Sequence, residues 1–262
     1  MEAEEFLKDK PVFTNLELEE FLGGRSGQPY WSRVAFLARL RRDGRVVRVR
    51  RGLFATVDGE PELCGVDHLA VAARLTADAI ITHSSVLEFL GLVPEKGGEV
   101  FYSAGRPYNP IAFLGRLYRG VKFPKSLVRS GQQHYLTQTT TSSGMTIKVA
   151  SLERTLVDLI DRPDLAGGWV NTVKLLALIK NPDLDAVVEY TRALGNSTTA
   201  AKVGYYLTGR LDRLERLGEA QRHLIALSEL KPNQPHYLDR SHRRDGHLVA
   251  DWNLIVNCEE AL

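Results

Sequence analysis

The sequence has little cysteine and no long apolar run. Cys64 and Cys258 are too few and too far apart for a disulfide framework, and no Cys-x-x-Cys or Cys/His zinc spacing occurs. No apolar stretch approaches the ~18 residues of a membrane span. The chain begins MEAEEFLKDK, which is acidic where a signal peptide starts basic and continues apolar. These absences predict a cytoplasmic protein that does not associate with a membrane.

The composition is that of a globular protein with an uneven charge distribution. The 262 residues are 44% hydrophobic and 25% charged, enough for one large core or two smaller ones. Residues 25–52 hold nine arginines and one aspartate, a net charge of +8. The whole chain has a net charge of +2, so the other residues together carry −6. A basic N-terminal head on a mildly acidic body favours a polyanionic partner for the head alone.

The head has the pattern of two helices separated by a short loop. The first is expected over 16–22, ending at Gly23-Gly24, and the second over 30–42, ending at Asp43-Gly44. On a helical wheel, the second helix has an apolar arc and a small, polar and basic stripe. The apolar arc holds Val34, Phe36, Leu37, Ala38 and Leu40, and the stripe holds Ser32, Ala35, Arg39 and Arg42.

A two-stranded ribbon follows the second helix. Val47 and Val49 are expected to point inward and Arg48 and Arg50 outward, with a turn at Arg51-Gly52. Together these elements predict a winged helix-turn-helix that binds double-stranded DNA. The residues expected in or beside the major groove are Gln28, Ser32, Arg33, Arg39 and Arg42, and those expected on phosphates are Arg45, Arg48, Arg50 and Arg51. A solvated basic face, a protein-binding winged helix and an RNA target are the alternatives.

The body is expected to mix helices and strands, with a helical second half. We therefore predict an α+β chain with a winged helix-turn-helix domain at 1–60 and a mixed α/β domain at 61–262. Ser151 is expected to cap one helix, and another is expected over 183–194, ending at Gly195. The other expected helices are 66–75, 84–90, 197–207 and 211–230, and the expected strands are 79–82, 99–103, 121–128, 134–140, 145–150 and 247–257.

Three features suggest enzyme chemistry; we reject the first and favour a structural interpretation of the other two. GVKFPKS, at 120–126, has a proline where a phosphate loop needs a glycine. Glu153, Arg154 and Asp158 share one helix, where an ion pair between Arg154 and Asp158, or a buried network, is the simpler interpretation. The third feature is a histidine and aspartate segment that fits no metal template and also contains arginines; its members are His236, Asp239, His242, Asp245, His247 and Asp251. We expect no catalytic residue, metal or cofactor.

Four stretches, in this order, carry a resemblance to a known family. They are RVVRVRRGLFATV, ADAIITHSSVLEFLGL, ASLERTLVDLIDRPDLAGGW and LDAVVEYTRALGNSTTAAKVGYYL, at 45–57, 77–92, 150–169 and 184–207. Their order and spacing are similar to those of the AbiEi-type antitoxins and transcriptional regulators of type IV toxin-antitoxin (abortive infection) systems. The resemblance implies a winged-helix head that binds inverted repeats upstream of its own operon. It also implies a C-terminal domain that counteracts a cognate nucleotidyltransferase toxin.

The sequence thus predicts a DNA-binding antitoxin that represses its own operon and is not an enzyme. The nucleotidyltransferase signature, a Gly-Ser turn followed by paired aspartates that hold magnesium, is missing, so the chain resembles the restraining partner and not the toxin. One alternative is a repressor with a ligand-binding C-terminal domain and no toxin partner. Another is a nuclease with its centre in 236–251. A monomer and a weak dimer both fit inverted repeats.

Overall fold

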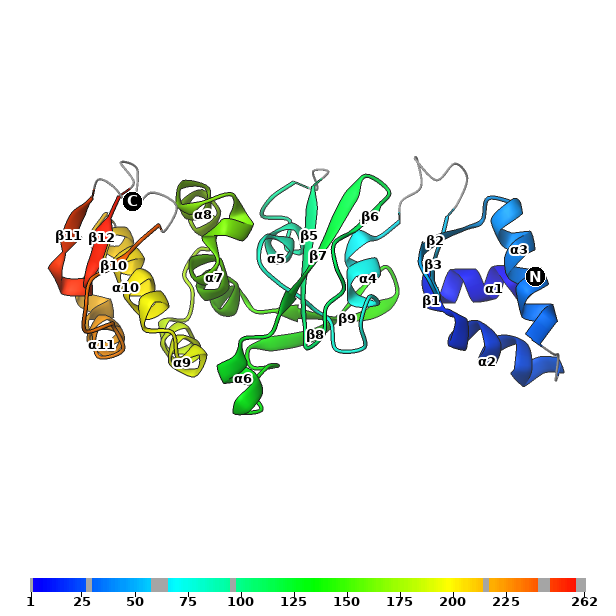
Figure 1. Cartoon of the computed structure of the whole chain (residues 1–262), viewed down its shortest axis with the longest axis horizontal. Helices are drawn as coiled ribbons and strands as arrows, with labels where there is room; N and C mark the ends of the chain where they lie inside the picture. Colours follow the sequence, from blue (N-terminus) through cyan, green and yellow to red (C-terminus); the bar gives the residue numbers. More distant parts are fainter. Residues whose placement is uncertain are drawn as a thin grey trace. The chain divides into compact units, whose positions relative to one another are not determined.

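The structure is a computed structural model that describes residues 2–26, 30–57, 66–94, 98–213, 217–239 and 246–257. Helices and strands alternate along these ranges, which confirms the mixed α+β class (Figure 1). Two compact units divide the chain: unit 1 is Met1–Ile81, Glu95–Lys122 and Thr139–Val149, and unit 2 is Thr82–Pro94, Phe123–Gln138 and Ala150–Leu262. The domain boundary expected near residue 60 stays a prediction, because it falls outside the described residues.

The N-terminal part of unit 1, residues 2–57, is called the head from here on. It has a three-stranded antiparallel sheet of order β1-β3-β2 and three helices. A small aromatic and aliphatic core lies between them. In this core the rings of Phe6 and Phe13 pack edge to face, with their centres 5.0 Å apart. The elements are α1 (Glu2–Asp9), β1 (Val12–Thr14), α2 (Asn15–Ser26), α3 (Tyr30–Arg42), β2 (Val46–Arg50) and β3 (Leu53–Thr56).

The head differs from the sequence prediction in three elements. Neither α1 nor β1 was predicted, although α1 buries Phe6 and Leu7 in the core. The expected end of the first helix at Gly23-Gly24 is wrong, because α2 continues to Ser26. Gly23 does not adopt a positive φ, and a Cβ there would meet no other atom, so this glycine weakens the helix without ending it.

The remainder of unit 1 is built on a six-stranded mixed sheet of order β6-β7-β5-β4-β9-β8. A short helix, α4 (His68–Ala73), precedes it, and the Asp67 carboxylate caps α4 by accepting from the N–H groups of Leu69 and Ala70. The strands are β4 (Ile80–Ile81), β5 (Glu99–Ala104), β6 (Ile111–Phe113), β7 (Arg116–Lys122), β8 (Thr137–Ser142) and β9 (Met145–Ala150).

The predicted strand at 121–128 is wrong, while the one at 145–150 is confirmed as β9. The strand β7 ends at Lys122, and the helix α6 (Lys125–Arg129) of unit 2 begins directly after Pro124. Proline cannot donate to a strand ladder but suits the start of a helix, which accounts for the change of structure there.

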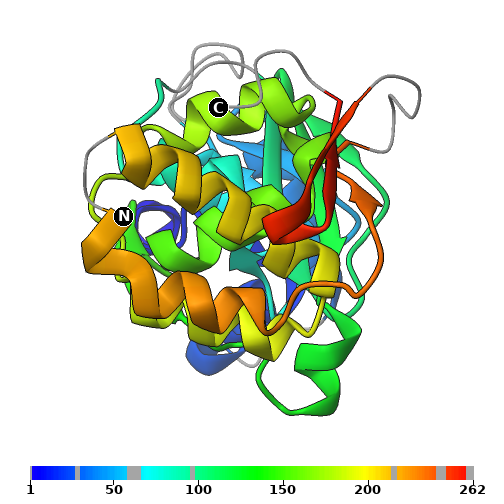
Figure 2. The same cartoon turned by 90° about the vertical axis from the view of Figure 1, so that its left-hand side faces the viewer.

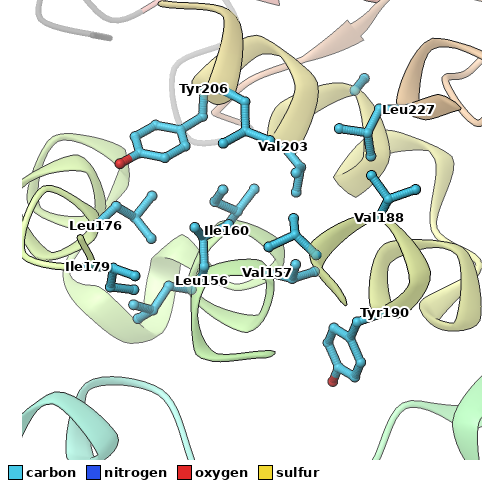
Figure 3. Close-up of a cluster of buried hydrophobic side chains, with 14 of the residues drawn as sticks. Leu156, Val157, Ile160, Leu176, Ile179, Val188, Tyr190, Val203, Tyr206 and Leu227 are labelled. Atoms are coloured by element: carbon cyan, nitrogen blue, oxygen red, sulfur yellow. The ribbon is translucent and has the colours of Figure 1, made fainter. Parts of the chain in front are cut away.

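Unit 2 is mainly helical. Its core lies between α7 (Leu152–Asp161), α9 (Leu184–Leu194), α10 (Ser197–Arg213) and α11 (Leu217–Ser228), with side chains such as Ile160, Val188 and Val203 meeting at its centre (Figure 3). The other helices are α5 (Ser84–Phe89), η1 (Pro163–Ala166) and α8 (Trp169–Leu176). The predicted caps are confirmed: Ser151 accepts from the Arg154 N–H at the start of α7, and Gly195, with a φ of 64°, ends α9.

The C-terminal segment forms a small sheet of order β10-β12-β11 instead of the single closing strand that was predicted. Its strands are β10 (His236–Tyr237), β11 (His247–Val249) and β12 (Leu254–Val256). A 3-10 turn, η2 (Ala250–Trp252), reverses the chain between β11 and β12, and Asn253 accepts a φ of 50°. Figure 2 faces this end and shows α10 and α11 side by side, with β11 and β12 next to them.

Candidate nucleic-acid interface

The helix α3 presents a continuous exposed surface on one side and core residues on the other. Leu40 is buried, and Phe36 and Leu37 are partly buried against the core of the head. The helix ends where the Arg45 N–H donates to the Leu40 carbonyl and Gly44 adopts a φ of 67°. Because only these three core side chains of 34–42, the part of α3 whose side chains are described, face the core, the others face solvent. The exposed residues there are Val34, Ala35, Ala38, Arg39, Arg41 and Arg42.

The exposed side of α3 is broader and more apolar than the helical wheel predicted. The wheel placed Val34 and Ala38 on the buried arc, but Val34 is 42% exposed and Ala38 is exposed too. The unpredicted helix α1 contributes Phe6 and Leu7 to the core against which Phe36 and Leu37 pack. The stripe on α3 therefore combines small apolar side chains with arginines.

The arginines of this stripe are held only loosely. Arg39 Nε lies 3.8 Å and Arg42 Nε 3.6 Å from the carboxylate of Asp43, and both arginine side chains are more than half exposed. Exposed ion pairs of this kind contribute little to stability in water and are screened by salt. Both guanidinium groups can therefore exchange Asp43 for an anionic partner at small cost.

The ribbon of β2 and β3 carries arginines beside α3, but its register differs from the simple alternation that was predicted. A bulge between Arg48 and Arg50 shifts the pairing, so that Val46 and Val49 are buried while Val47 is only half-buried. Gly52, with a φ of 79°, makes the turn to β3, as predicted. Arg48 and Arg51 are exposed, and Arg45 is half-buried.

Arg50 has a set of partners that the sequence did not reveal. Its Nη2 donates to the Leu75 carbonyl at 2.9 Å and its Nη1 to the Arg51 carbonyl at 3.0 Å. The guanidinium also lies over the ring of Tyr108, 4.4 Å from the ring centre. This side chain is half-buried against the rest of unit 1, whereas Arg48 and Arg51 on the same ribbon are open to solvent.

Three of the predicted site residues cannot be placed in this surface. Gln28 lies outside the described residues. Ser32 and Arg33 belong to the first turn of α3, but their side chains also lie outside the described part.

The suspected catalytic features of the body have structural roles where they are described. Arg154 is buried, its Nε lies 3.4 Å from Asp158 Oδ2, and its Nη1 donates to the carbonyls of Gln133 and Tyr135. Tyr190 Oη donates to the other oxygen of Asp158 at 2.8 Å. This confirms the buried network expected around Arg154 and Asp158.

The described part of the histidine and aspartate segment gives no metal cluster. Among the described residues, no group of three or more His, Cys, Asp or Glu side chains could hold a metal ion. His236 Nδ1 lies 2.6 Å from the Thr198 hydroxyl, while His242 and Asp245 lie outside the described residues.

His83, at the start of α5, is buried, but its side chain does not cap the helix, and burial lowers its pKa. None of the helices in the described ranges is long and apolar enough to cross a membrane.

Unit 2 contains a polar cavity of about 450 Å³ between η1, the start of α10 and the segment after β10. The buried side chains of Thr198, Thr199 and Lys202 line it, with the more exposed Arg162 and Asp239. The volume falls in the range of small-molecule sites. Two groups in its wall already donate to the carboxylate of Asp161: Asn196 Nδ2, at 2.9 Å, and the Thr199 hydroxyl.

Comparisons with known proteins give a likeness in fold. No protein-family model matches the chain, and no curated protein does. Among solved structures, the chain is similar to the crystal structure of the RV2827C protein from Mycobacterium tuberculosis, with a TM-score of 0.58 and 17% sequence identity. The match covers 97% of this chain and 89% of that chain. At this identity the match shows a similarity in fold alone.

Proposed function

We propose that the head is a winged helix-turn-helix that binds double-stranded DNA, with α3 in the major groove and the β2–β3 ribbon on the backbone. The observation that carries this proposal is the exposed side of α3, which combines small side chains with arginines that have only weak, exposed ion pairs. Ala35 and Ala38 let the helix approach the base pairs closely, while Arg39 is long enough to reach a guanine edge. Arg48 and Arg51 supply charge for phosphates beside the groove.

Within this proposal, Arg50 is not assigned to a DNA phosphate. Its two Nη groups donate to carbonyl oxygens and its planar face stacks on Tyr108, so reaching DNA would break three interactions at once. Arg48 and Arg51, with Arg45 as a neighbour, are the phosphate contacts that we retain on the ribbon. Ser32, Arg33 and Gln28 remain predicted contacts at the start of α3.

We further propose that the chain is an antitoxin that represses its own operon and counteracts a cognate nucleotidyltransferase toxin through residues 61–262. This part of the proposal rests on the four sequence stretches that resemble AbiEi-type regulators. It requires a nucleotidyltransferase gene beside the gene of this protein. Co-expression of the two should restore growth that the neighbouring gene alone arrests, and arrest that persists despite co-expression would reject the antitoxin role.

DNA binding is tested by fluorescence anisotropy on the duplex directly upstream of the reading frame, with a scrambled duplex and a salt series. We expect preference for the upstream duplex and affinity that falls steeply with salt. Arg39→Ala should weaken binding and reduce the preference for the upstream duplex. Arg48→Ala should weaken binding to both duplexes equally and lower the slope of log affinity against log salt concentration by about one unit. Arg129→Ala, which removes an exposed arginine from α6, serves as the control for lost charge. Equal, weak binding to both duplexes would refute the proposal.

A repressor without a toxin partner is the second candidate, and the polar cavity of unit 2 favours it. A ligand in that cavity would contact Thr198, Thr199 and Lys202, which belong to the long helix α10. The two candidates differ in one observable: a neighbouring nucleotidyltransferase gene whose product is neutralised supports the antitoxin, and a small molecule that changes operator affinity supports the repressor.

A further inference from the structure

Besides the cavity of unit 2, the structure has a cavity of about 320 Å³ in unit 1, and all the charged residues in its wall are cations. It lies where the end of β2, the segment after α4 and the strand β9 come together. The charged residues in its wall are Arg50, Arg74 and Lys148, and the wall contains no carboxylate. The rest of the wall is small or apolar, including Ala73, Ala77 and Ile147.

The cavity wall concentrates polar groups that lack a partner. In the described part of the chain, six buried side-chain nitrogen or oxygen atoms have no hydrogen-bond partner. Three of the six are Arg50 Nε, Arg74 Nε and Thr76 Oγ1, and all three residues line this cavity. A buried donor without an acceptor is costly, and such groups are rare in folded proteins. Their clustering indicates a missing acceptor.

Internal partners neutralise only part of the charge. Arg74 forms an ion pair with Glu17, whose pKa is lowered: burial opposes the shift, but hydrogen bonds from Thr14 and the charge of Arg74 outweigh it. The Nη groups of Arg50 donate to neutral carbonyl oxygens, which leave its charge uncompensated. Lys148 is exposed and has no ion pair with any described residue. A net positive charge therefore faces the cavity.

We propose that this cavity binds the phosphate group of a small phosphorylated ligand. A phosphate offers oxygens in tetrahedral directions, which suits two arginines, a lysine and a hydroxyl that reach it from different elements, whereas a carboxylate offers two oxygens in one plane. In this proposal the phosphate oxygens accept from the unpartnered Nε–H groups of Arg50 and Arg74. The volume is at the lower end of small-molecule sites and suits a ligand of about the size of a nucleoside monophosphate.

This site does not depend on the proposed DNA binding, but it lies next to it. Arg50 ends the strand β2 and is directly followed by the exposed Arg51 at the turn of the ribbon. A ligand that holds Arg50 and Lys148 together would fix the ribbon against the sheet of unit 1.

The test is calorimetric titration of the full chain with adenosine 5′-monophosphate and with inorganic phosphate. Adenosine, and sodium chloride at equal ionic strength, serve as ligand controls. We expect binding of both phosphates and no response to either control. Lys148→Gln and Thr76→Val should each weaken phosphate binding at least fivefold, because the first removes a positive charge from the wall and the second removes a hydroxyl donor. Lys122→Gln, which neutralises an exposed lysine at the end of β7, should leave it unchanged.

Two results would overturn the proposal. The first is a response to sodium chloride equal to the response to phosphate, or an equal loss in Lys122→Gln, since either would indicate general charge screening. The second comes from titration in the presence of saturating upstream duplex. Loss of adenosine 5′-monophosphate binding there, together with an equally weakened duplex affinity in Lys148→Gln, would assign the phosphate to the DNA backbone instead of a free ligand. Binding that persists beside the duplex supports the small ligand.

Discussion

The ring of Trp252 lies directly on the backbone of Gly204, in the middle of α10. A Cβ at position 204 would overlap the Cζ3 and Cη2 atoms of the buried ring, so the contact between α10 and η2 requires glycine there. The φ of Gly204 is not positive, so its requirement is one of space and not of backbone conformation.

Gly204→Ala should therefore destabilise the protein although alanine favours helices. We expect a loss of roughly 1–3 kcal/mol in the free energy of unfolding, because the ring must move out of a packed site. Urea unfolding followed by circular dichroism measures it. Gly23→Ala in α2 is the matched control, since a Cβ there meets nothing, and it should gain about 0.5–1 kcal/mol. Equal effects of the two substitutions would contradict this account.

Arg154→Met should be among the most destabilising substitutions in unit 2. It leaves the buried Asp158 without its cation and the carbonyls of Gln133 and Tyr135 without a donor. The expected cost is about 3–5 kcal/mol. The double variant Arg154→Met/Asp158→Leu should cost less than the sum of the two single variants, and simple additivity in urea unfolding would show that the two side chains do not interact.

The exposed Arg192→Met on α9 is the control for this experiment. A surface substitution of this kind is expected to stay within about 0.5 kcal/mol. A similar loss in Arg192→Met and Arg154→Met would mean that arginine content, and not the buried network, decides the result.

His83 should make stability depend on pH below neutrality. Burial is the main cause that lowers its pKa from 6.5, and the charges of Arg162 and Arg154 act in the same direction against those of Asp158 and Asp161. The unfolded chain then takes up a proton near pH 6.5, whereas the folded chain takes it up only at lower pH. Stability is therefore expected to be full above pH 6.5 and to fall as pH drops towards the folded pKa, by at most about 1.4 kcal/mol per pH unit.

The variant His83→Asn should reduce this slope, whatever its effect on stability at pH 7.5. Urea midpoints between pH 5 and 7.5 give the comparison, with the exposed His247→Asn as the control. An unchanged slope in His83→Asn would show that other groups cause the acid sensitivity.

The exposed Val34 predicts a contribution to sequence preference that the helical wheel did not. If α3 enters the major groove, Val34 is placed to contact a thymine methyl group. Replacing each thymine of the bound duplex by deoxyuridine, one at a time, removes only that methyl. The substitution at one of these positions should weaken binding of the wild type about fourfold, because burying one methyl carbon contributes about 0.8 kcal/mol. The same deoxyuridine substitution should have no effect on binding by Val34→Ala. An equal loss in the wild type and in Val34→Ala would exclude this contact.

Local signals in the sequence predicted the ends of several elements well. Ser151 and Gly195 act within one turn of the backbone, so their capping roles do not depend on the rest of the fold. The alternation in β9 likewise marks one strand with one buried side. Short edge elements such as β1 and β6, with three residues each, carry too few positions for a pattern.

The sites themselves depended on tertiary contacts that no local pattern shows. The exposure of Val34 is a property of the folded head that the helical wheel did not predict. The partners of Arg50 come from Leu75 and Tyr108, and the cationic cavity of unit 1 is lined by Arg50, Arg74 and Lys148 from three separate segments. Charge composition predicted where cations gather, but not which of them are held internally.

The order of strands in the large sheet has a consequence for how the chain is synthesised. The strand β4 pairs with β9 through Ile81 and Val149, so the sheet of unit 1 cannot close until nearly 150 residues have left the ribosome. The head, whose strands pair within the first 57 residues, has no such requirement. Emerging chains should therefore carry a formed head ahead of an open sheet edge, and pulse proteolysis of stalled chains of increasing length would show protection appearing in these two steps.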